Sequence, residues 1–180
     1  RSTVTEGNSD IASGVQDLAA ATEVVTRETG QQKMHLWGQS SGALRAGAFA
    51  EVYPDRAGRL ILGALTYTGE GSPTLTERAE RVEYYRNNNR RVRDIELLRG
   101  IFTRDVPGSG DPRVADAMAE AERPFGDTVP SGTYFDMTAN LPVVDPTKIL
   151  SPVLVVRGEY DGIATDDDVL NFYKQLPNSD

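Results

Sequence analysis

The chain has 180 residues, and its 27 acidic side chains outnumber its 19 basic ones to give a net charge of −8, which argues against a nucleic-acid-binding surface. It has no cysteine, which excludes disulfides and a thiolate nucleophile. No run of about 18 apolar residues is present, so no segment is predicted to span a membrane.

The first third of the chain alternates between helix and strand patterns. The predicted elements are a helix at residues 10–29, a strand at 33–37, a helix at 41–52 and a core strand at 59–64. Ser9 or Asp10 is a candidate cap for the first helix, and Gly30 ends it. The predicted buried stripe of this helix is Ile11, Val15, Leu18, Thr22 and Val25. Such alternation predicts a parallel sheet flanked by helices, an α/β fold.

From residue 66 to residue 146 the alternation stops, and the sequence is mostly helical and heavily charged. Helices are predicted at about 74–86, 90–104 and 112–123, with a Gly/Pro-rich break at 106–112. We interpret residues 66–146 as a helical lid inserted into a core that comprises residues 1–65 and 147–180.

The sheet pattern resumes after the predicted lid. Residues 152–158 form an unbroken β-branched and apolar run, which suits a parallel strand buried on both faces. A loop at 159–165 then leads to a predicted helix at 166–176. Asp166, Asp167 and Asp168 fall in the first turn of that helix, where they are expected to cap it and to complement its dipole.

The segment Gly38-Gln39-Ser40-Ser41-Gly42 has the pattern G-x-S-x-G between a predicted strand and a predicted helix. A strand, a sharp turn and a helix form a nucleophile elbow, in which the central serine projects above the sheet. Ser40 is therefore the candidate nucleophile, and the backbone N–H of Ser41 is a candidate donor to an oxyanion. Both flanking glycines are expected to be required for the close backbone approach in the turn.

A serine hydroxyl needs a general base, and that base needs an acid to orient it. Asp161 is the candidate acid because it follows the predicted strand at 152–158, and catalytic groups gather at the carboxyl ends of parallel strands. Glu159 is the rival for this role. The alternative for Asp161 is a purely structural turn aspartate.

The only histidine, His35, is not expected to be the base. It precedes Ser40 by five residues in an extended strand, which places it roughly 16 Å away at about 3.3 Å per residue. A base must lie within hydrogen-bonding reach of the hydroxyl. His35 is therefore predicted to be structural, and Trp37 in the same strand is predicted to pack.

Two further groups of residues are candidates for substrate contact. The basic stretch at 86–93 would steer an anionic substrate, although such a run is more often a solvated helix junction. One or two of the lid aromatics and methionines are expected to line an acyl or alcohol pocket. The candidates are Tyr84, Tyr85, Phe102, Phe125, Tyr134, Phe135 and Met137.

Over nearly its whole length the chain resembles the α/β-hydrolase superfamily. The resemblance rests on residues 36–43 for the elbow, on Tyr53-Pro54-Asp55-Arg56 before a strand, and on residues 151–161 for the acid strand. Arg1-Ser2-Thr3 is similar to the end of the family's Gly-x-Gly-x-Ser segment. The resemblance implies the order Ser, Asp, His for the triad, with the histidine beyond Asp180 and four strands and the second oxyanion donor before Arg1.

The resemblance thus predicts that these 180 residues are the central part of a serine hydrolase acting on a carboxylic ester or lactone, a small-molecule substrate. No metal or organic cofactor is implied. The 180-residue chain alone is expected to be inactive, and to aggregate, form a homo-oligomer or associate with the missing part of the fold. A cytoplasmic location is favoured, although no feature fixes the compartment.

Other functions stay open at this point. The same residues would serve an amide, peptide or carbon–carbon bond hydrolase or a perhydrolase of the same fold. A catalytically silent module that binds a ligand or a partner would also retain the elbow sequence.

Overall fold

The structure is a computed structural model that describes residues 5–178. The segment Arg1-Ser2-Thr3, which entered the family resemblance, lies outside the described residues. None of the described helices is long and apolar enough to cross a membrane.

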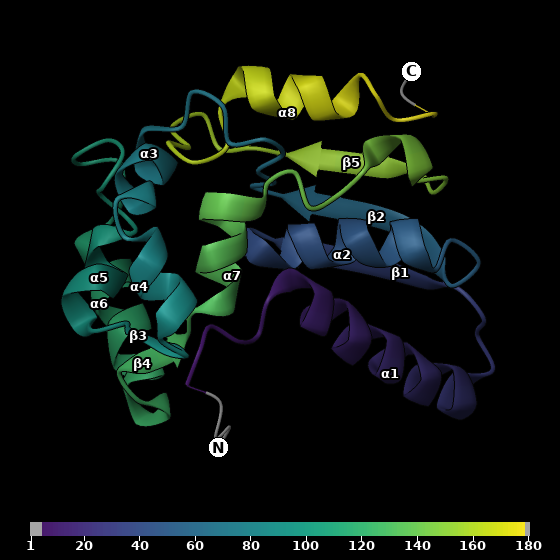
Figure 1. Ribbon diagram of the computed structural model, residues 1–180, viewed down its shortest axis with the longest axis horizontal. Coiled ribbons are helices and arrows are strands. Elements are labelled where there is room, and N and C mark those ends of the chain that lie inside the picture. The colour runs from purple at the N-terminus through teal and green to yellow at the C-terminus, as the bar shows by residue number, and fades with distance from the viewer. Residues whose placement is uncertain (1–4, 179–180) are drawn as a thin grey trace.

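The centre of the fold is a parallel sheet of three strands in the order β1-β2-β5. The strands are β1 (Met34–Gln39), β2 (Ala57–Gly63) and β5 (Val153–Val156). In the register, Trp37 lies opposite Ile61, which in turn lies opposite Leu154. The carboxyl ends of all three strands point toward the same edge of the sheet, on the left in Figure 1.

Helices α1 (Ile11–Thr29), α2 (Ser41–Val52) and α8 (Asp166–Tyr173) share one core with the sheet (Figure 1). Asp10 caps α1 through a bond from Ser13 N, and Gly30 ends it with φ of 76°. The largest fully buried apolar side chains of the core are Leu44, Phe49, Leu60, Leu62, Leu65, Ile149 and Phe172.

The buried stripe of α1 differs from the predicted one. Ile11, Val15 and Thr22 are buried as expected, Leu18 is partly buried, and Val25 is exposed, whereas the unpredicted Ala19 is buried. At about 100° per residue, Val25 lies about 80° from the middle of the buried stripe, which places it at the edge of the face that packs on α2.

The opposite face of the sheet is open in the part of the chain that the structure describes. Trp37 is 75% exposed, and Ile61 and Leu154 in the same cross-strand row are also exposed. The prediction that Trp37 packs is therefore wrong for these residues, as is the prediction that the strand at 152–158 is buried on both faces. The apolar run at 152–158 has the composition of a strand that is covered on both faces. In the described residues, however, α1, α2 and α8 pack against only one face of the sheet.

This open face gives a prediction for fluorescence. Trp37 is the only tryptophan, so its emission should lie at long wavelength and should be quenched by acrylamide nearly as readily as free indole. Leu154→Lys is the matched control. It removes apolar surface from the same cross-strand row without covering Trp37, so the emission and quenching of Trp37 should not change. A short-wavelength, protected emission from a monomer would contradict the open face.

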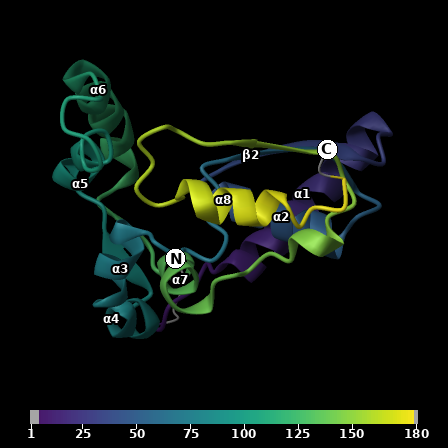
Figure 2. The same ribbon diagram turned by 90° about the horizontal axis from the view of Figure 1, so that it is seen from above.

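Residues 66–146 form a series of short elements at one end of the sheet (Figures 1 and 2). They are α3 (Pro73–Ala79), α4 (Val82–Asn87), β3 (Arg90–Val92), α5 (Ile95–Gly100), α6 (Pro112–Glu122), the 3₁₀ turn η1 (Arg123–Phe125), β4 (Thr128–Pro130), α7 (Gly132–Phe135), the π-helical turn η2 (Asp136–Asn140) and, at the end, the 3₁₀ turn η3 (Pro146–Lys148). The division of the chain into a core and a lid stays a prediction.

Two helices predicted in this segment differ in the structure. The helix predicted at 74–86 is two helices, α3 and α4, separated at Glu80 and Arg81. The helix predicted at 90–104 begins instead with strand β3, which pairs antiparallel with β4, and only α5 is helical. Because the partner strand lies 38 residues away, the local sequence gives no sign of this pairing.

The last part of this segment joins the sheet core. Asp136 is buried and accepts a hydrogen bond from Ile11 N at the start of α1, at 2.7 Å. Met137 and Val144 belong to the same hydrophobic core as the sheet. The short elements are thus tied to the core near the carboxyl ends of the strands.

Candidate functional site

Ser40 stands at a sharp strand-to-helix turn at the carboxyl end of β1. Its backbone has φ of 54° and ψ of −121°, a region that residues other than glycine rarely adopt. Ser40 N donates to Gly63 O of the neighbouring strand at 2.8 Å, and α2 begins at the next residue. Backbone strain of this kind costs about 1–3 kcal/mol and persists where the surroundings hold it. The side chain is exposed above the sheet edge.

The two flanking glycines are not equivalent. A Cβ on Gly38 would lie 2.1 Å from Gly42 O and 2.7 Å from Ala43 N, so no side chain fits there without moving backbone. A Cβ on Gly42 would meet nothing within 4 Å among the described residues. The expectation that both glycines are required for close approach is therefore confirmed for Gly38 and wrong for Gly42.

Ser41 is the first residue of α2. The first N–H groups of a helix have no intrahelical acceptor, and they carry the positive end of the helix dipole. The backbone N–H of Ser41 therefore has the position expected of an oxyanion donor. Its role stays a prediction.

Asp161 lies in the loop that follows β5, two strands away from β1. Its Oδ1 accepts bonds from Ile163 N at 2.9 Å and from Ala164 N at 3.0 Å. Its Oδ2 has no hydrogen-bond partner among residues 5–178. One oxygen thus fixes the side chain, and the other is available to accept from an imidazole N–H.

The candidate nucleophile and the candidate acid follow two strands that flank β2. The carboxyl ends of β1 and β5 therefore lie roughly 10 Å apart at about 4.8 Å per strand spacing. Ser40 directly follows β1, and Asp161 lies five residues beyond the end of β5. A triad would require an imidazole ring between the two side chains. The chain supplies no such ring, because its only histidine is elsewhere.

The remaining acidic candidates and His35 lie away from this position. His35 Nδ1 accepts from Arg59 N at 2.9 Å on the open face of the sheet. Glu159 is exposed. Thr165 caps α8, while Asp168 is buried and accepts bonds from the backbone of Tyr67 and Thr68. Among the described residues, no group of three His, Cys, Asp or Glu side chains has the arrangement of a metal site.

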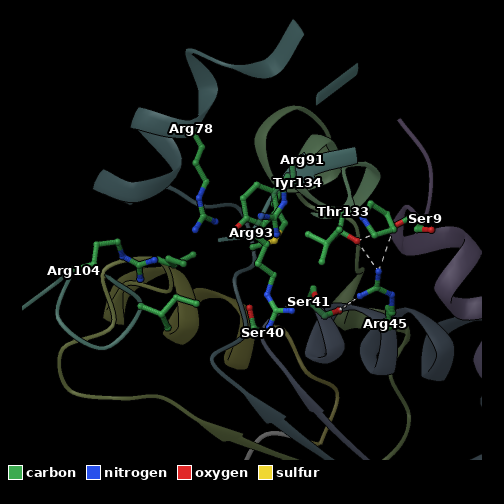
Figure 3. Close-up of a pocket in the computed structure, with 15 residues that line it drawn as sticks. Ser9, Ser40, Ser41, Arg45, Arg78, Arg91, Arg93, Arg104, Thr133 and Tyr134 are labelled. Carbon is green, nitrogen blue, oxygen red and sulfur yellow. Dashed lines mark hydrogen bonds between the residues drawn. The ribbon is translucent and has the colours of Figure 1, made fainter. Parts of the chain in front are cut away.

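Ser40 and Ser41 line a cavity of about 480 Å³ at the sheet edge (Figure 3). The other lining residues are Ser9, Arg45, Arg78, Arg91, Arg93, Ile101, Arg104, Val129, Pro130, Thr133, Tyr134, Met137 and Ile163. Asp161 is not among them, although Ile163 of the same loop is. Among the described residues, five arginines and no carboxylate line the cavity, in a chain whose net charge is −8.

Two residues of the basic stretch at 86–93, Arg91 and Arg93, line this cavity, while Arg86 and Arg90 are exposed. Arg91 of β3 and Arg93, the residue directly after β3, line the cavity, whereas the intervening Val92 is exposed. Strand geometry sends alternate side chains to opposite faces, which explains the separation. The favoured interpretation of this stretch as a solvated helix junction is wrong for Arg91 and Arg93, because it assumed a helix where β3 forms.

Sequence reasoning missed Arg45, Arg78 and Arg104, which come from separate elements and share no motif. Of the seven aromatic and methionine candidates, Tyr134 and Met137 line the cavity, while Phe125 is 83% exposed.

A salt bridge connects this cavity to the acid loop. Arg104 binds Asp105 through two bonds of 2.9 and 2.7 Å. The hydrogen bonds from Arg104 hold the pKa of Asp105 below its ordinary value, with a further contribution from Gly162 N–H. Gly162 directly follows Asp161, so Asp105 fixes the backbone of the loop that presents the candidate acid.

Comparison with solved structures identifies the fold. A meta-cleavage product hydrolase from Pseudomonas fluorescens superposes with a TM-score of 0.66 at 15% identity, over 99% of this chain and 64% of the other. An α/β-hydrolase fold protein from Chitinophaga pinensis gives 0.64 at 17% identity, over 96% and 62%. The chain has the α/β-hydrolase fold.

An esterase from Thermogutta terrifontis, solved with malate bound, is also similar to the chain, with a TM-score of 0.64 at 24% identity over 99% of this chain and 64% of the esterase. This chain thus spans less than two thirds of the length of these α/β-hydrolase fold proteins. Neither a protein-family model nor a curated protein sequence matches it.

Proposed function

We propose that the protein is a serine hydrolase that cleaves a carboxylic ester or lactone by acyl transfer to water. The observation that carries the proposal is the strained conformation of Ser40 at the mouth of the cavity. Strained non-glycine residues cluster at active sites, where the surrounding structure holds them in place. Esterase, monoacylglycerol lipase and thioesterase proteins among the solved structures of the same fold support acyl transfer.

In this proposal Ser40 Oγ attacks the carbonyl carbon, and its proton passes to a histidine that these 180 residues do not include. The Ser41 N–H stabilises the oxyanion, and collapse of the tetrahedral intermediate expels the alcohol, which takes the proton from the histidine. Water then attacks the acyl-enzyme by the same route and releases the acid. Asp161 orients the histidine and stabilises its charged form.

Labelling with a fluorophosphonate tests the nucleophile. The intact protein should take up one equivalent of label at Ser40, and Ser40→Ala should abolish the uptake, because only an activated serine attacks phosphorus at a useful rate. Mass spectrometry of the tryptic peptide locates the label.

Ser41→Ala is the matched control for this experiment. It removes the neighbouring hydroxyl but keeps the backbone N–H, so labelling at Ser40 should persist. Label on Ser41 would refute the assignment of Ser40 and transfer the nucleophile to Ser41. Absence of label from the intact protein would refute the hydrolase and leave a ligand-binding module of this fold as the better function.

A further inference from the structure

The cavity beside Ser40 concentrates positive charge from distant parts of the chain. Arg45 comes from α2, Arg78 from α3, Arg91 from β3, Arg93 from the residue directly after β3, and Arg104 from the turn after α5. Figure 3 shows these side chains around the space above Ser40 and Ser41. None of the described residues that line this space is a carboxylate, so the positive charge that faces it is offset only by carboxylates outside the lining.

Three of the arginines are held by partners within the protein. Arg93 pairs with Glu122 at 3.0 Å, and Arg104 pairs with Asp105 at 2.7 Å. Arg45 donates to Thr133 Oγ1 at 2.6 Å and to the backbone oxygens of Ser41 and Ser9. These contacts position the three side chains and satisfy much of their donor capacity.

Arg78 and Arg91 are different, because neither forms an ion pair with any residue in the described range 5–178. Both guanidinium groups lie over the ring of Tyr134, at 4.4 Å for Arg78 and 3.4 Å for Arg91 from the ring centroid. A cation over an aromatic face is stabilised by the ring quadrupole, but that contact satisfies none of the N–H donors in the guanidinium plane.

Arg91 has buried N–H donors that lack an acceptor. Its Nε and Nη1 are buried and have no hydrogen-bond partner within residues 5–178. Burial lowers the pKa of Arg91, and the neighbouring charges of Arg78 and Arg93 lower it further. A guanidinium nevertheless stays protonated in proteins. Two buried charged donors without an acceptor destabilise the empty site, and an anion that accepts from them would relieve this cost.

We propose that Arg78 and Arg91 bind a carboxylate of the substrate, so that the ester cleaved at Ser40 is one that bears a second, free carboxylate. That the substrate is an ester rests on the proposed function. That it bears a free carboxylate rests on the cavity alone. The guanidinium fork matches the two oxygens of a carboxylate. Ile101, Val129, Met137 and Ile163 line the same cavity and suit the hydrocarbon part of an organic acid better than a bare inorganic ion.

Binding of glutarate to the intact protein tests the site without any turnover. Isothermal titration calorimetry at constant ionic strength should detect glutarate binding and no binding of its neutral diamide. Arg78→Gln and Arg91→Gln should each weaken glutarate binding at least about ten-fold, as loss of a charge-assisted hydrogen bond does. Arg90→Gln is the matched control: it lies next to Arg91 in β3, but Arg90 bonds Thr128 and does not line the cavity.

Thermal unfolding provides a second readout if a variant is hard to titrate. Glutarate should raise the melting temperature of the native protein and of Arg90→Gln, and should not raise that of Arg91→Gln. Equal glutarate affinity in Arg90→Gln and Arg91→Gln would overturn the proposal. Inorganic phosphate binding tighter than glutarate would overturn the carboxylate as the ligand.

Turnover separates this proposal from the proposed function. The p-nitrophenyl monoester of glutarate should be cleaved with a kcat/KM at least about ten-fold above that of p-nitrophenyl pentanoate, and this ratio should fall in Arg91→Gln but not in Arg90→Gln. If Ser40 cleaves p-nitrophenyl pentanoate as well as the glutarate ester, the carboxylate site is refuted while the proposed hydrolase stands. Glutarate binding in a protein whose Ser40 is never labelled would refute the hydrolase alone.

Discussion

Replacing Asp168 with alanine is expected to lower the free energy of unfolding by about 4 kcal/mol, because a buried charged acceptor that serves several donors would be lost. Asp168 is 3% exposed. Its carboxylate accepts from Tyr67 N at 2.8 Å, from Thr68 N at 2.8 Å and from Gly69 N at 3.2 Å, and the Thr68 hydroxyl donates to it as well. Alanine would leave these N–H groups without their acceptor in a partly buried site.

Urea unfolding measures this effect, and Asp167→Ala is its matched control. Asp167 occupies the same first turn of α8 but is exposed, so its loss removes only a favourable interaction with the helix dipole, about 0.3–1 kcal/mol. A stability of Asp168→Ala within about 1 kcal/mol of that of Asp167→Ala would show that water replaces the carboxylate without penalty.

The role of Asp168 was not predictable from the sequence. Three aspartates at the start of a helix are expected to act on that helix alone, and Asp166 and Asp167 are indeed exposed in its first turn. Asp168 instead binds the segment that follows β2, about a hundred residues earlier. Helical rotation alone decides which of three adjacent carboxylates faces the core, and the sequence does not state where the core lies.

The elbow was predictable because its determinants are local. An apolar strand, Gly38 and an alanine-rich helix follow one another directly, and the structure forms them with helix bounds of Ser41–Val52 that match the predicted range. The strand β3 was not predictable, because its hydrogen-bond partners in β4 lie 38 residues away and its arginine-rich sequence equally suits a helix.

The basic cavity depends on both local and long-range determinants. Each of its five arginines is an ordinary charged residue in its own segment, and only the packing of α2, α3, β3 and the turn after α5 brings them to one space. Within β3, the period of two that sends Arg91 inward and leaves Arg90 to bond Thr128 follows only after the strand is recognised. Composition pointed the other way, since the chain as a whole is acidic.

Replacing Asp161 with asparagine is expected to lower kcat of the intact protein by about 10⁴-fold, with little change in fold. The asparagine Oδ1 would still accept from Ile163 N and Ala164 N, so the loop would keep its turn. The NH₂ group would then occupy the place of Oδ2. A donor at that position disfavours the imidazole tautomer that can accept a proton from Ser40.

Glu159→Gln distinguishes Asp161 from its rival in the same loop. Glu159 is exposed, and its side chain has no hydrogen bond or ion pair to another described residue that would fix its direction. Its replacement should leave kcat within a few-fold of the native value, whereas a loss in Glu159→Gln together with full activity in Asp161→Asn would transfer the acid role to Glu159. Fluorophosphonate labelling of Ser40 should slow in parallel with kcat in Asp161→Asn, because both reactions need the same oriented base.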